Sequence, residues 1–354
     1  MKVALVYDRV NKWGGAERVM LALHKIFPDA PLYTSVHNKE KASWSSVFDV
    51  RTSFVQNLPF AKSSHELYAS LMPMAFESFN FDQYDLVISV TSEAAKGIIT
   101  KPNTFHISYV LTPTRYLWSG YKDYFRNEIT KFLSTYPILY LRKWDLIASC
   151  RPDKLIAISE DVKKRIKKYY KRDSQIIFPP ILPFKEKIIT KKNKEEFYLV
   201  VSRLVYYKRI DLAIKTFNKL GFKLKIVGVG GEEESLKAIA KENIEFLGNL
   251  TDDKLSFYYK NCTALIFPGK EDFGLVMAEA QSFGKPVIAY KKGGALDIIK
   301  NGVTGEFFDK QTEESLTGAL KKSLNKSYNS KLCMENAKRF SYANFKKQIL
   351  REIK

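Results

Sequence analysis

The sequence predicts an α/β protein with two domains, each built around a parallel β-sheet. Its 354 residues are too many for one ordinary hydrophobic core and suit two domains of typical size. Short apolar segments alternate with helical segments through both halves of the chain, which is the βαβ rhythm of parallel sheets. Residues 178–196, rich in proline and then in lysine, separate the two halves and have the composition of an exposed linker.

The first domain is expected to cover residues 1–182. Its first strand is followed by a helix at about residues 17–27, and each later apolar run is followed by polar or helical sequence. Runs that are short and mostly apolar are typical of strands covered on both faces. The strands predicted from these runs are residues 2–7, 85–90, 106–110 and 154–159.

The second domain repeats the pattern and is expected at residues 183–337, with a last helix at about 338–354. Helices are predicted at about residues 209–220, after Gly231 and from about Gly274. The charged C-terminal tail also has a helical pattern from about Lys331. The strands predicted here are residues 197–202, 223–228, 244–248, 264–269 and 286–290.

The composition indicates a globular protein with an anionic partner. Hydrophobic residues make up 45% of the chain, and the formal net charge is +20, which favours phosphate-bearing substrates or acidic lipid surfaces. Three widely spaced cysteines lack the pattern of a disulfide framework or a zinc site, so we expect a cytoplasmic location. The N-terminal apolar run is too short for a signal sequence, and no run is long enough to span a bilayer. Any membrane contact, at the inner face, would therefore be peripheral.

The densest basic segment, residues 161–172, alternates apolar and cationic positions at helical spacing. The pattern favours a solvated outer face of a helix packed on a sheet, and membrane docking is the second interpretation. The chain has no aromatic RNP-type strand, KH-type loop or zinc knuckle, so we expect no nucleic acid partner.

Gly14 and Gly15 lie between the first strand and the first helix. In a doubly wound domain this turn brings backbone amides and a helix N-terminus to an anion. A glycine pair here also serves simple tight turns. The full dinucleotide fingerprint and its ribose-binding acid are absent, which disfavours an NAD enzyme.

Arg203 and Lys208 follow the first strand of the second domain, at the edge where open α/β sheets bind ligands. An arginine fork and a lysine point charge together suit a diphosphate. Two surface cations in a basic protein are the plainer alternative.

The segment 264–290 contains two carboxylates in the sequence EDFGLVMAEA. Glu271 lies in the loop after a buried strand, where it can accept hydrogen bonds from sugar hydroxyls. The amides of Phe273, Gly274, Leu275 and Val276 form a positive helix end suited to phosphate. Glu279 lies about 7.5 Å farther along the helix axis and suits a second group such as a ribose. Its apolar neighbours indicate a buried carboxylate that needs a partner.

These motifs resemble the GT4 family of retaining glycosyltransferases, which have the GT-B fold of two Rossmann-like domains facing across a cleft. The similarity is carried by VSRLVYYKR, EDFGLVMAEA and KPVIAYKKGGALDII, and it extends to GGAERV and HISYVLTPTRYLW, so it covers nearly the whole chain. It implies that Arg203 and Lys208 hold the donor pyrophosphate, that Glu271 contacts the donor sugar and that Glu279 holds the ribose. It further implies that the amides near Gly15 lie close to the reacting phosphate and that the last helix crosses back onto the first domain. No metal or other cofactor is implied beyond the nucleotide sugar.

Two positions depart from the family pattern. Leu111 stands where relatives commonly have a histidine before the Thr-Pro pair, and GVGGEEE replaces a Gly-Asp-Gly-Pro turn. His106 is not expected to substitute, since nothing near it in sequence forms a recognisable dyad.

The expected function is transfer of a hexose, from GDP-mannose or a UDP-hexose, to a glycan or lipid-linked acceptor in cell-surface polysaccharide synthesis. Two alternatives stay open. One is a sugar-nucleotide-binding, membrane-docking protein with weak or no transfer activity, as Leu111 suggests. The other is a sugar-nucleotide epimerase, although no second constellation for proton abstraction is present.

Overall fold

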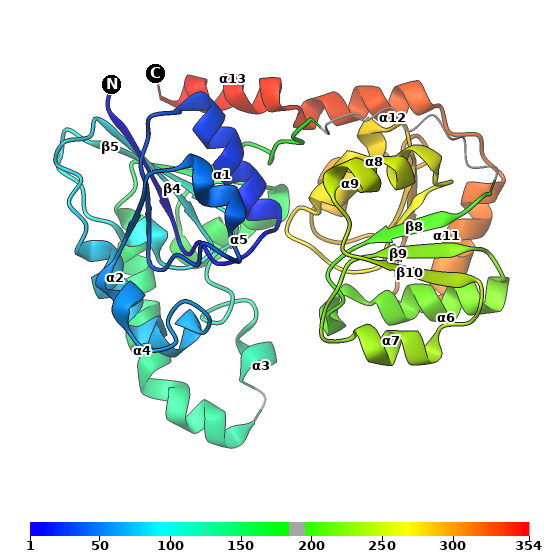
Figure 1. The fold of residues 1–354 in the computed structure, drawn as a ribbon, viewed down its shortest axis with the longest axis horizontal. Coiled ribbons are helices and arrows are strands. Elements are labelled where there is room, and N and C mark those ends of the chain that lie inside the picture. Colours follow the sequence, from blue (N-terminus) through cyan, green and yellow to red (C-terminus); the bar gives the residue numbers. More distant parts are fainter. Residues whose placement is uncertain (126, 184–194, 354) are drawn as a thin grey trace. The chain divides into compact units, whose positions relative to one another are not determined.

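The computed structural model describes residues 1–125, 127–183 and 195–353. The chain divides into two compact units (Figure 1). Unit 1 contains Met1–Phe178 and Lys346–Lys354, and unit 2 contains Pro179–Phe345. Each unit is built around one parallel β-sheet with helices on its faces, so the predicted α/β class with two doubly wound domains is confirmed. Most of the predicted linker, residues 184–194, lies outside the described residues.

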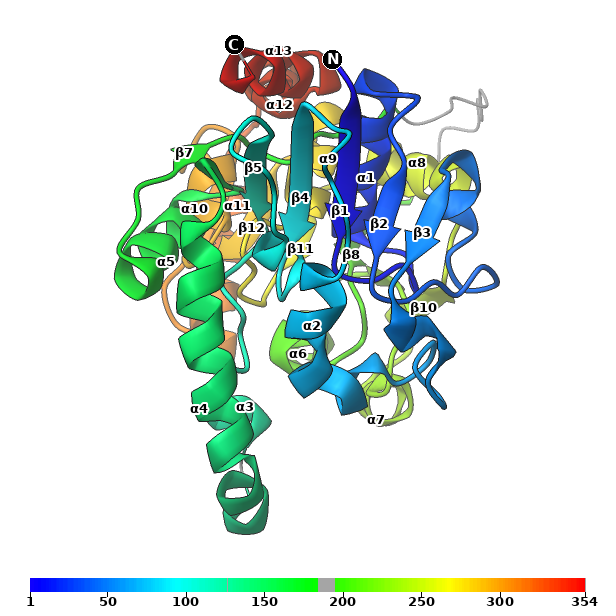
Figure 2. The same cartoon turned by 90° about the vertical axis from the view of Figure 1, so that its left-hand side faces the viewer.

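The sheet of unit 1 has the strand order β3-β2-β1-β4-β5-β6-β7 (Figure 2). Its order reverses between β1 and β4, which pair directly, with Ala4 opposite Val87. Open α/β sheets bind ligands at the carboxyl ends of strands where the order reverses in this way. β2, β3 and β7, which contain three residues or fewer, were not predicted because so short a run has no clear period. The strands are β1 Val3–Tyr7, β2 Leu32–Thr34, β3 Val50–Thr52, β4 Leu86–Thr91, β5 Phe105–Val110, β6 Lys154–Ala157 and β7 Gln175–Ile176.

The two helices predicted in unit 1, at about residues 17–27 and 161–172, are present as α1 and α5 with shifted ends, whereas α2, α3 and α4 were not predicted. α1 begins at Gly15, two residues before the predicted start, because Gly14 is extended and the glycine after it takes the first helical position. In α5, Ser159 caps the amide of Val162 at 3.2 Å. Its apolar side is buried and its lysines are exposed, as predicted for a helix packed on a sheet. The helices are α1 Gly15–Ile26, α2 Met72–Glu77, α3 Tyr121–Tyr124, α4 Glu128–Cys150 and α5 Glu160–Tyr170.

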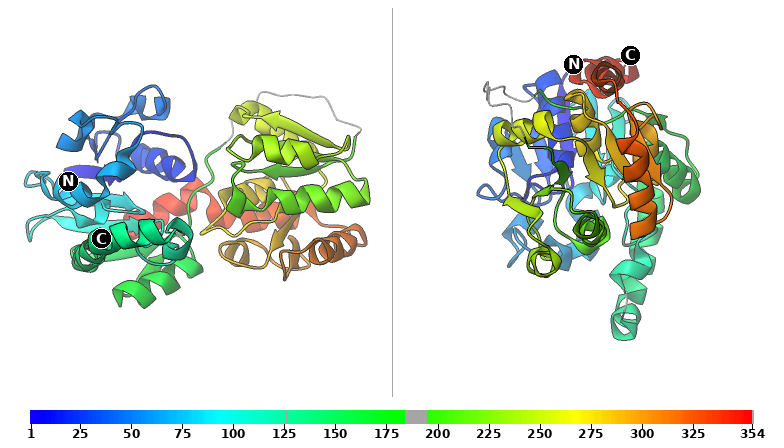
Figure 3. Two further views of the ribbon diagram at one scale, coloured as in Figure 1. Left: turned by 90° about the horizontal axis from the view of Figure 1, so that it is seen from below. Right: turned by 90° about the vertical axis from the view of Figure 1, so that its right-hand side faces the viewer.

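The sheet of unit 2 has the order β10-β9-β8-β11-β12-β13, and its order reverses between β8 and β11. Helices α6 and α7 lie on one side of the sheet, and α8 and α9 lie on the other (Figures 1 and 3). Buried aliphatic and aromatic side chains of β8, β9, α6 and α11 fill the space between these layers. The strands are β8 Tyr198–Val201, β9 Leu224–Val227, β10 Ile244–Gly248, β11 Leu265–Phe267, β12 Val287–Tyr290 and β13 Gly305–Phe308.

The helices predicted at about residues 209–220, after Gly231 and from about Gly274 are present as α6, α7 and α9, whereas α8, α10 and α11 were not predicted. α6 begins one residue later than expected because Arg209 adopts a left-handed backbone conformation with φ 55°. A change of this kind ends regular helical geometry. The helices are α6 Ile210–Leu220, α7 Glu233–Ile239, α8 Asp252–Asn261, α9 Leu275–Ser282, α10 Ala295–Ile298, α11 Glu313–Leu324 and α12 Ser330–Ala337.

The C-terminal region is not one helix from residue 338. A short 3-10 turn, Lys338–Phe340, follows α12, and the last helix, α13, covers Tyr342–Glu352. The amide of Ile181 donates to the carbonyl of Phe340 at 2.7 Å. From Lys346 onward the chain belongs to unit 1, where the Lys154 ammonium donates to the carbonyl of Glu352 at 2.8 Å. Within the described ranges, no helix has the length and hydrophobicity of a membrane-spanning segment.

Candidate functional site

The candidate site of unit 2 lies at the carboxyl ends of β8 and β11, where the strand order reverses. Two glycines let the loops after β8 and β9 pack closely. A Cβ on Gly228 would lie 1.8 Å from the carbonyl oxygen of Ser202, and one on Gly230 would lie 2.1 Å from that of Leu204. Only residues without a side chain fit such contacts. The GVGG segment therefore shapes the loop that carries Arg203, a role that sequence reasoning did not assign.

Lys208 and Glu271 form an ion pair across the switch point. Lys208 comes from the loop after β8 and Glu271 from the loop after β11, and their side chains are only 12% and 19% exposed. The backbones of the two loops are close as well, because a Cβ on Gly269 would lie 2.9 Å from the carbonyl oxygen of Lys208. The structure thus brings a cation and a carboxylate together that sequence spacing alone left unrelated.

Arg203 lies in the same loop as Lys208 and is exposed. Its guanidinium donates to the hydroxyl of Tyr207 at 2.6 Å, and the Lys208 ammonium lies 5.4 Å from the centre of the Tyr207 ring. Tyr207 therefore orients both cations, and a cation near an aromatic face is attracted to it. The two positive charges share one loop, as a diphosphate site requires.

A second glycine pair supports the loop that carries Glu271. The amide of Gly294 donates to the carbonyl of Glu271 at 2.9 Å. A Cβ on Gly293 would lie 2.1 Å from that same carbonyl oxygen, and one on Gly294 would lie 2.2 Å from the carbonyl oxygen of Phe273. Gly293 also has a positive φ of 63°, which favours glycine. The loop after β12 therefore holds residues 271–273 in place through its backbone.

The N-terminus of α9 follows this loop directly. Gly274 has φ 87°, and the chain turns there from the loop into the helix. Phe273 is 4% exposed and packs edge-on against Phe340, with ring centres 5.5 Å apart. This packing fixes the start of the helix. The first amides of a helix have no intrahelical partner and attract anions, so Leu275 and Val276 occupy the predicted kind of position.

Glu279 is buried inside α9, with 2% exposure. Its carboxylate accepts a hydrogen bond of 2.9 Å from the hydroxyl of Tyr259, a fully buried residue of α8 whose ring stacks on Phe283. The buried carboxylate thus has the kind of partner that its apolar neighbours required. Tyr259 was not predicted, since nothing in its local sequence distinguishes it from a core tyrosine.

Unit 1 has polar groups at its own switch point. Gly15 opens α1, and a Cβ placed on it would meet nothing within 4 Å, so its backbone is accessible. Asp8, at the end of β1, accepts hydrogen bonds from the Thr91 hydroxyl at 3.0 Å and from the Ala95 amide at 2.8 Å. The carboxylate therefore ties the loop after β4 to β1.

Arg9 and Glu93 form an ion pair of 2.5 Å at the carboxyl ends of β1 and β4. Burial raises the pKa of Glu93, and the Arg9 guanidinium opposes that rise. The pair is formed by residues from the loops after β1 and β4, which are distant in sequence, and no local motif indicated it. It adds a second partly buried ion pair at the carboxyl edge of a sheet, here in unit 1.

His106 is a core residue of β5. It is fully buried, its Nε2 lies 2.9 Å from the Ser89 hydroxyl, and burial together with nearby arginines lowers its pKa to about 3. The side chain is therefore neutral and structural, which agrees with the interpretation from sequence. Leu111 follows β5, and its amide donates to the carbonyl of Thr91 at 2.8 Å.

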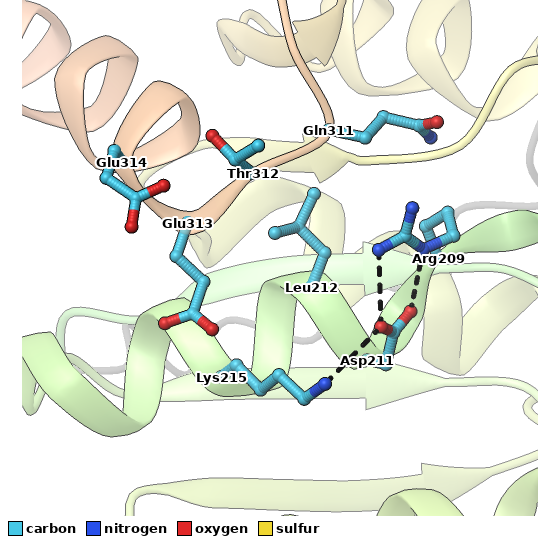
Figure 4. Close-up of a pocket in the computed structure, with 8 residues that line it drawn as sticks. All are labelled: Arg209, Asp211, Leu212, Lys215, Gln311, Thr312, Glu313 and Glu314. Atoms are coloured by element: carbon cyan, nitrogen blue, oxygen red, sulfur yellow. Dashed lines mark hydrogen bonds and ion pairs between the residues drawn. The ribbon is translucent and has the colours of Figure 1, made fainter.

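Two observations concern other sites in the described part of the chain. A pocket of about 200 Å³ lies between α6 and the start of α11 (Figure 4). Three of its charges pair with one another, Arg209 with Asp211 at 3.1 Å and Lys215 with Asp211 at 3.9 Å, and none of the predicted site residues lines it. Among residues 1–125, 127–183 and 195–353, no three His, Cys, Asp or Glu side chains are grouped to hold a metal ion.

Comparisons with known proteins find similar sequences and folds. The family model of glycosyl transferases group 1 matches residues 183–346. An uncharacterized glycosyltransferase of Methanocaldococcus jannaschii is 27% identical over 199 residues, which are 55% of this chain and 56% of the relative. The chain thus matches little more than half the length of that relative.

Solved structures resemble the whole chain. The lipopolysaccharide outer core galactosyltransferase WaaB has a TM-score of 0.66 at 20% identity, covering 100% of this chain and 99% of its own. The Anabaena protein HepE, solved with UDP-glucose, has a TM-score of 0.70 at 17% identity with the same coverage. At these identities the likeness concerns the fold. Residues 183–346 therefore match the glycosyl transferases of group 1, and the chain as a whole has the GT-B fold of these solved structures.

Proposed function

We propose that this protein is a retaining hexosyltransferase of the GT4 type. It moves a mannose- or glucose-type hexose from a nucleotide-diphosphate sugar to a glycan or lipid-linked acceptor in cell-surface polysaccharide synthesis. The observation that carries the proposal is the Lys208–Glu271 ion pair at the switch point of unit 2. The pair places a cation that can bind phosphate beside a carboxylate that can accept hydrogen bonds from hydroxyl groups. A nucleotide-diphosphate sugar presents both of these groups.

Each residue then has a role in donor binding. Arg203 and Lys208 bind the diphosphate, and the amides of Phe273, Gly274, Leu275 and Val276 add the positive end of α9. Glu271 accepts hydrogen bonds from the sugar, and Glu279, oriented by Tyr259, holds the ribose. The amide of Gly15, in unit 1, is assigned to binding of the reacting phosphate.

The transfer proceeds with retention at the anomeric carbon. The bond between that carbon and the leaving phosphate oxygen breaks, an oxocarbenium-like sugar forms, and the acceptor oxygen bonds to the same face. The acceptor proton passes to the leaving phosphate. Positioning and the charges of Arg203 and Lys208 lower the barrier, since fixed positive groups stabilise charge that develops in the transition state. Glu271, already paired with Lys208, is not assigned as a nucleophile.

We further propose that transfer needs no bound metal or other cofactor. The two cations and the α9 N-terminus supply positive charge where a metal would otherwise act. Incubation with EDTA should then leave the rate within twofold of the untreated protein. A loss of activity that Mg²⁺ or Mn²⁺ restores would contradict this part of the proposal.

The donor is proposed to be a UDP-hexose or GDP-mannose. HepE was solved with UDP-glucose and WaaB is a galactosyltransferase of the lipopolysaccharide outer core, which supports a UDP-hexose and a surface-polysaccharide role. A thermal-shift screen of UDP-glucose, UDP-galactose and GDP-mannose tests it. A ligand at one hundred times its dissociation constant stabilises the native state by about 2.7 kcal/mol. The bound sugar nucleotide should raise Tm by several degrees, and the shift should disappear in Lys208→Met.

A second candidate rests on Leu111, at the position where relatives commonly have a histidine. In this second candidate function, the protein binds a sugar nucleotide but transfers the sugar weakly or not at all. Hydrolysis of the stabilising donor without acceptor separates the two: release of nucleoside diphosphate and free sugar supports a working transferase, and binding without release supports the binding protein. NMR of the product anomer tests retention.

The protein is proposed to act in the cytoplasm, in peripheral contact with an anionic membrane that presents a lipid-linked acceptor. All three cysteines, Cys150, Cys262 and Cys333, are free, which is usual in a reducing compartment. The formal net charge of +20 favours an anionic surface. No nucleic acid partner is proposed.

A further inference from the structure

Helix α4 carries an apolar stripe on its exposed side. The exposed fractions are 78% for Phe132, 83% for Tyr136, 56% for Leu139, 50% for Tyr140 and 52% for Ile147. Their spacing of three, four and seven residues places them along one side of the helix. Single exposed apolar residues are common, whereas a contiguous row of large ones marks an interaction surface.

The opposite side of α4 is anchored in unit 1, so the stripe cannot turn inward. Asp145 is fully buried, pairs with the Lys96 ammonium at 2.5 Å and accepts from the Trp118 indole at 2.7 Å. Ile138 and Leu141 pack in one apolar cluster with Leu117. Rotating the helix would expose this cluster and break a buried ion pair, which is strongly destabilising. Figure 2 shows α4 extending away from the sheet of unit 1.

Positive charge accompanies the stripe. Lys143 is exposed on α4, three residues after Tyr140, and the carboxylates of α4 are compensated, Glu128 by Lys131 at 2.5 Å and Asp145 by Lys96. The neighbouring helix α5 packs against the end of α4, where Arg172 donates to the carbonyl of Ser149 at 2.8 Å. Four exposed lysines lie on α5: Lys163, Lys164, Lys167 and Lys168.

We propose that the α4 stripe docks this protein onto a bilayer that contains anionic phospholipids. Phenylalanine, tyrosine and leucine enter the boundary between headgroups and acyl chains, while the lysines of α4 and α5 remain among the headgroups. The site differs from the second interpretation drawn from sequence, which placed docking on the helix at residues 161–172. That helix, α5, buries its own apolar side and therefore contributes charge alone. The inference rests on the peripheral membrane contact proposed above and assigns its surface.

Vesicle sedimentation with the full chain tests the assignment. Wild type should pellet with vesicles of phosphatidylcholine and phosphatidylglycerol at 7:3 and much less with phosphatidylcholine alone, because lysines near an anionic surface are attracted to it. The variant Phe132→Ser, Tyr136→Ser, Leu139→Ser, Tyr140→Ser should lose at least tenfold in partitioning. Phe60→Ser with Leu67→Ser is the matched control, since those side chains are 76% and 72% exposed elsewhere in unit 1 and should bind as wild type does.

Charge is tested separately. Replacing the four exposed lysines of α5 by glutamine should weaken partitioning severalfold, as should 0.5 M NaCl. The single change Tyr136→Glu, at the most exposed position of the stripe, gives a second variant if the quadruple one does not fold, as judged by circular dichroism. It should also lose binding to anionic vesicles.

Three outcomes overturn the proposal: wild type fails to bind anionic vesicles, the stripe variants bind as wild type does, or the Phe60 and Leu67 control loses binding equally. A wild-type dimer that the stripe variant converts to a monomer, with no vesicle binding in either, would assign the stripe to a second copy instead. Donor thermal shifts measured without vesicles keep this result distinct from a failure of the proposed transfer function.

Discussion

The substitution Gly294→Ala tests whether backbone packing between two loops positions the donor site. Gly294 has φ −63°, so alanine can adopt its backbone conformation and the effect is purely steric. The added Cβ would lie 2.2 Å from the carbonyl oxygen and 2.3 Å from the Cα of Phe273, whereas real Cβ contacts stay above 3.0 Å. One of the two loops must therefore move by about 0.8 Å.

The magnitude follows from two terms. Losing the hydrogen bond from the Gly294 amide to the Glu271 carbonyl costs about 1 kcal/mol, and crowding a packed segment costs about 1–3 kcal/mol. Unfolding free energy should fall by roughly 2–4 kcal/mol, which lowers Tm by several degrees. A catalytic group displaced by about 1 Å slows a reaction about a hundredfold, so donor turnover should fall by that order.

Gly318→Ala is the matched control for this experiment. A Cβ on Gly318, in α11, meets nothing within 4 Å, and alanine favours a helix by up to about 1 kcal/mol over glycine. This variant should keep or raise Tm and retain full turnover. Calorimetry and nucleoside diphosphate release measure both quantities. If Gly294→Ala kept wild-type stability and turnover, the packing of these loops would not be what places Glu271.

Three further predictions follow from the contacts of single residues. Lys208→Met should reduce transfer about 10²- to 10³-fold by removing transition-state charge stabilisation, whereas Glu271→Gln should retain diphosphate binding; equal loss of nucleoside diphosphate affinity in both would refute separate roles. Tyr259→Phe should weaken nucleotide binding and lower the free energy of unfolding by about 1–3 kcal/mol, because it removes the hydroxyl that donates to Glu279. An unchanged nucleotide affinity in calorimetric titration would contradict this prediction. The pKa of His106 is lowered to about 3 in the folded protein. Between pH 6.5 and pH 3 only the unfolded chain binds a proton at this residue, so the free energy of unfolding falls as the pH is lowered through this range. About 2 kcal/mol should disappear between pH 7.5 and pH 5, and urea unfolding of His106→Gln should show a smaller loss over that range.

The sequence determined the fold class and the identity of most donor-site candidates. Short apolar runs separated by helical periods specify parallel strands covered by helices, because such strands must be buried on both faces. Arg203, Lys208 and Glu271 were predicted because they directly follow strands, and the carboxyl ends of parallel strands share one edge. The buried state of Glu279 also followed from its apolar neighbours.

Short strands and element boundaries were predicted less well. β7 contains two residues, Gln175–Ile176, and is defined by its pairing with Ile156 and Ala157 of β6. The start of α6 depends on the left-handed conformation of Arg209, which no local pattern announces. Likewise, the C-terminal helix breaks at Ser341, where the backbone is extended.

Tertiary structure alone decided which groups meet. The pairing of Lys208 with Glu271, of Arg9 with Glu93 and of Tyr259 with Glu279 joins residues that are 63, 84 and 20 positions apart. Local sequence carries no signal for such contacts, because they depend on strand order and on the close loop approach that glycines permit. The same holds for the exposed stripe of α4. Its apolar residues would suit a core equally well, and only the packing of Asp145 and its neighbours determines which side of the helix faces solvent.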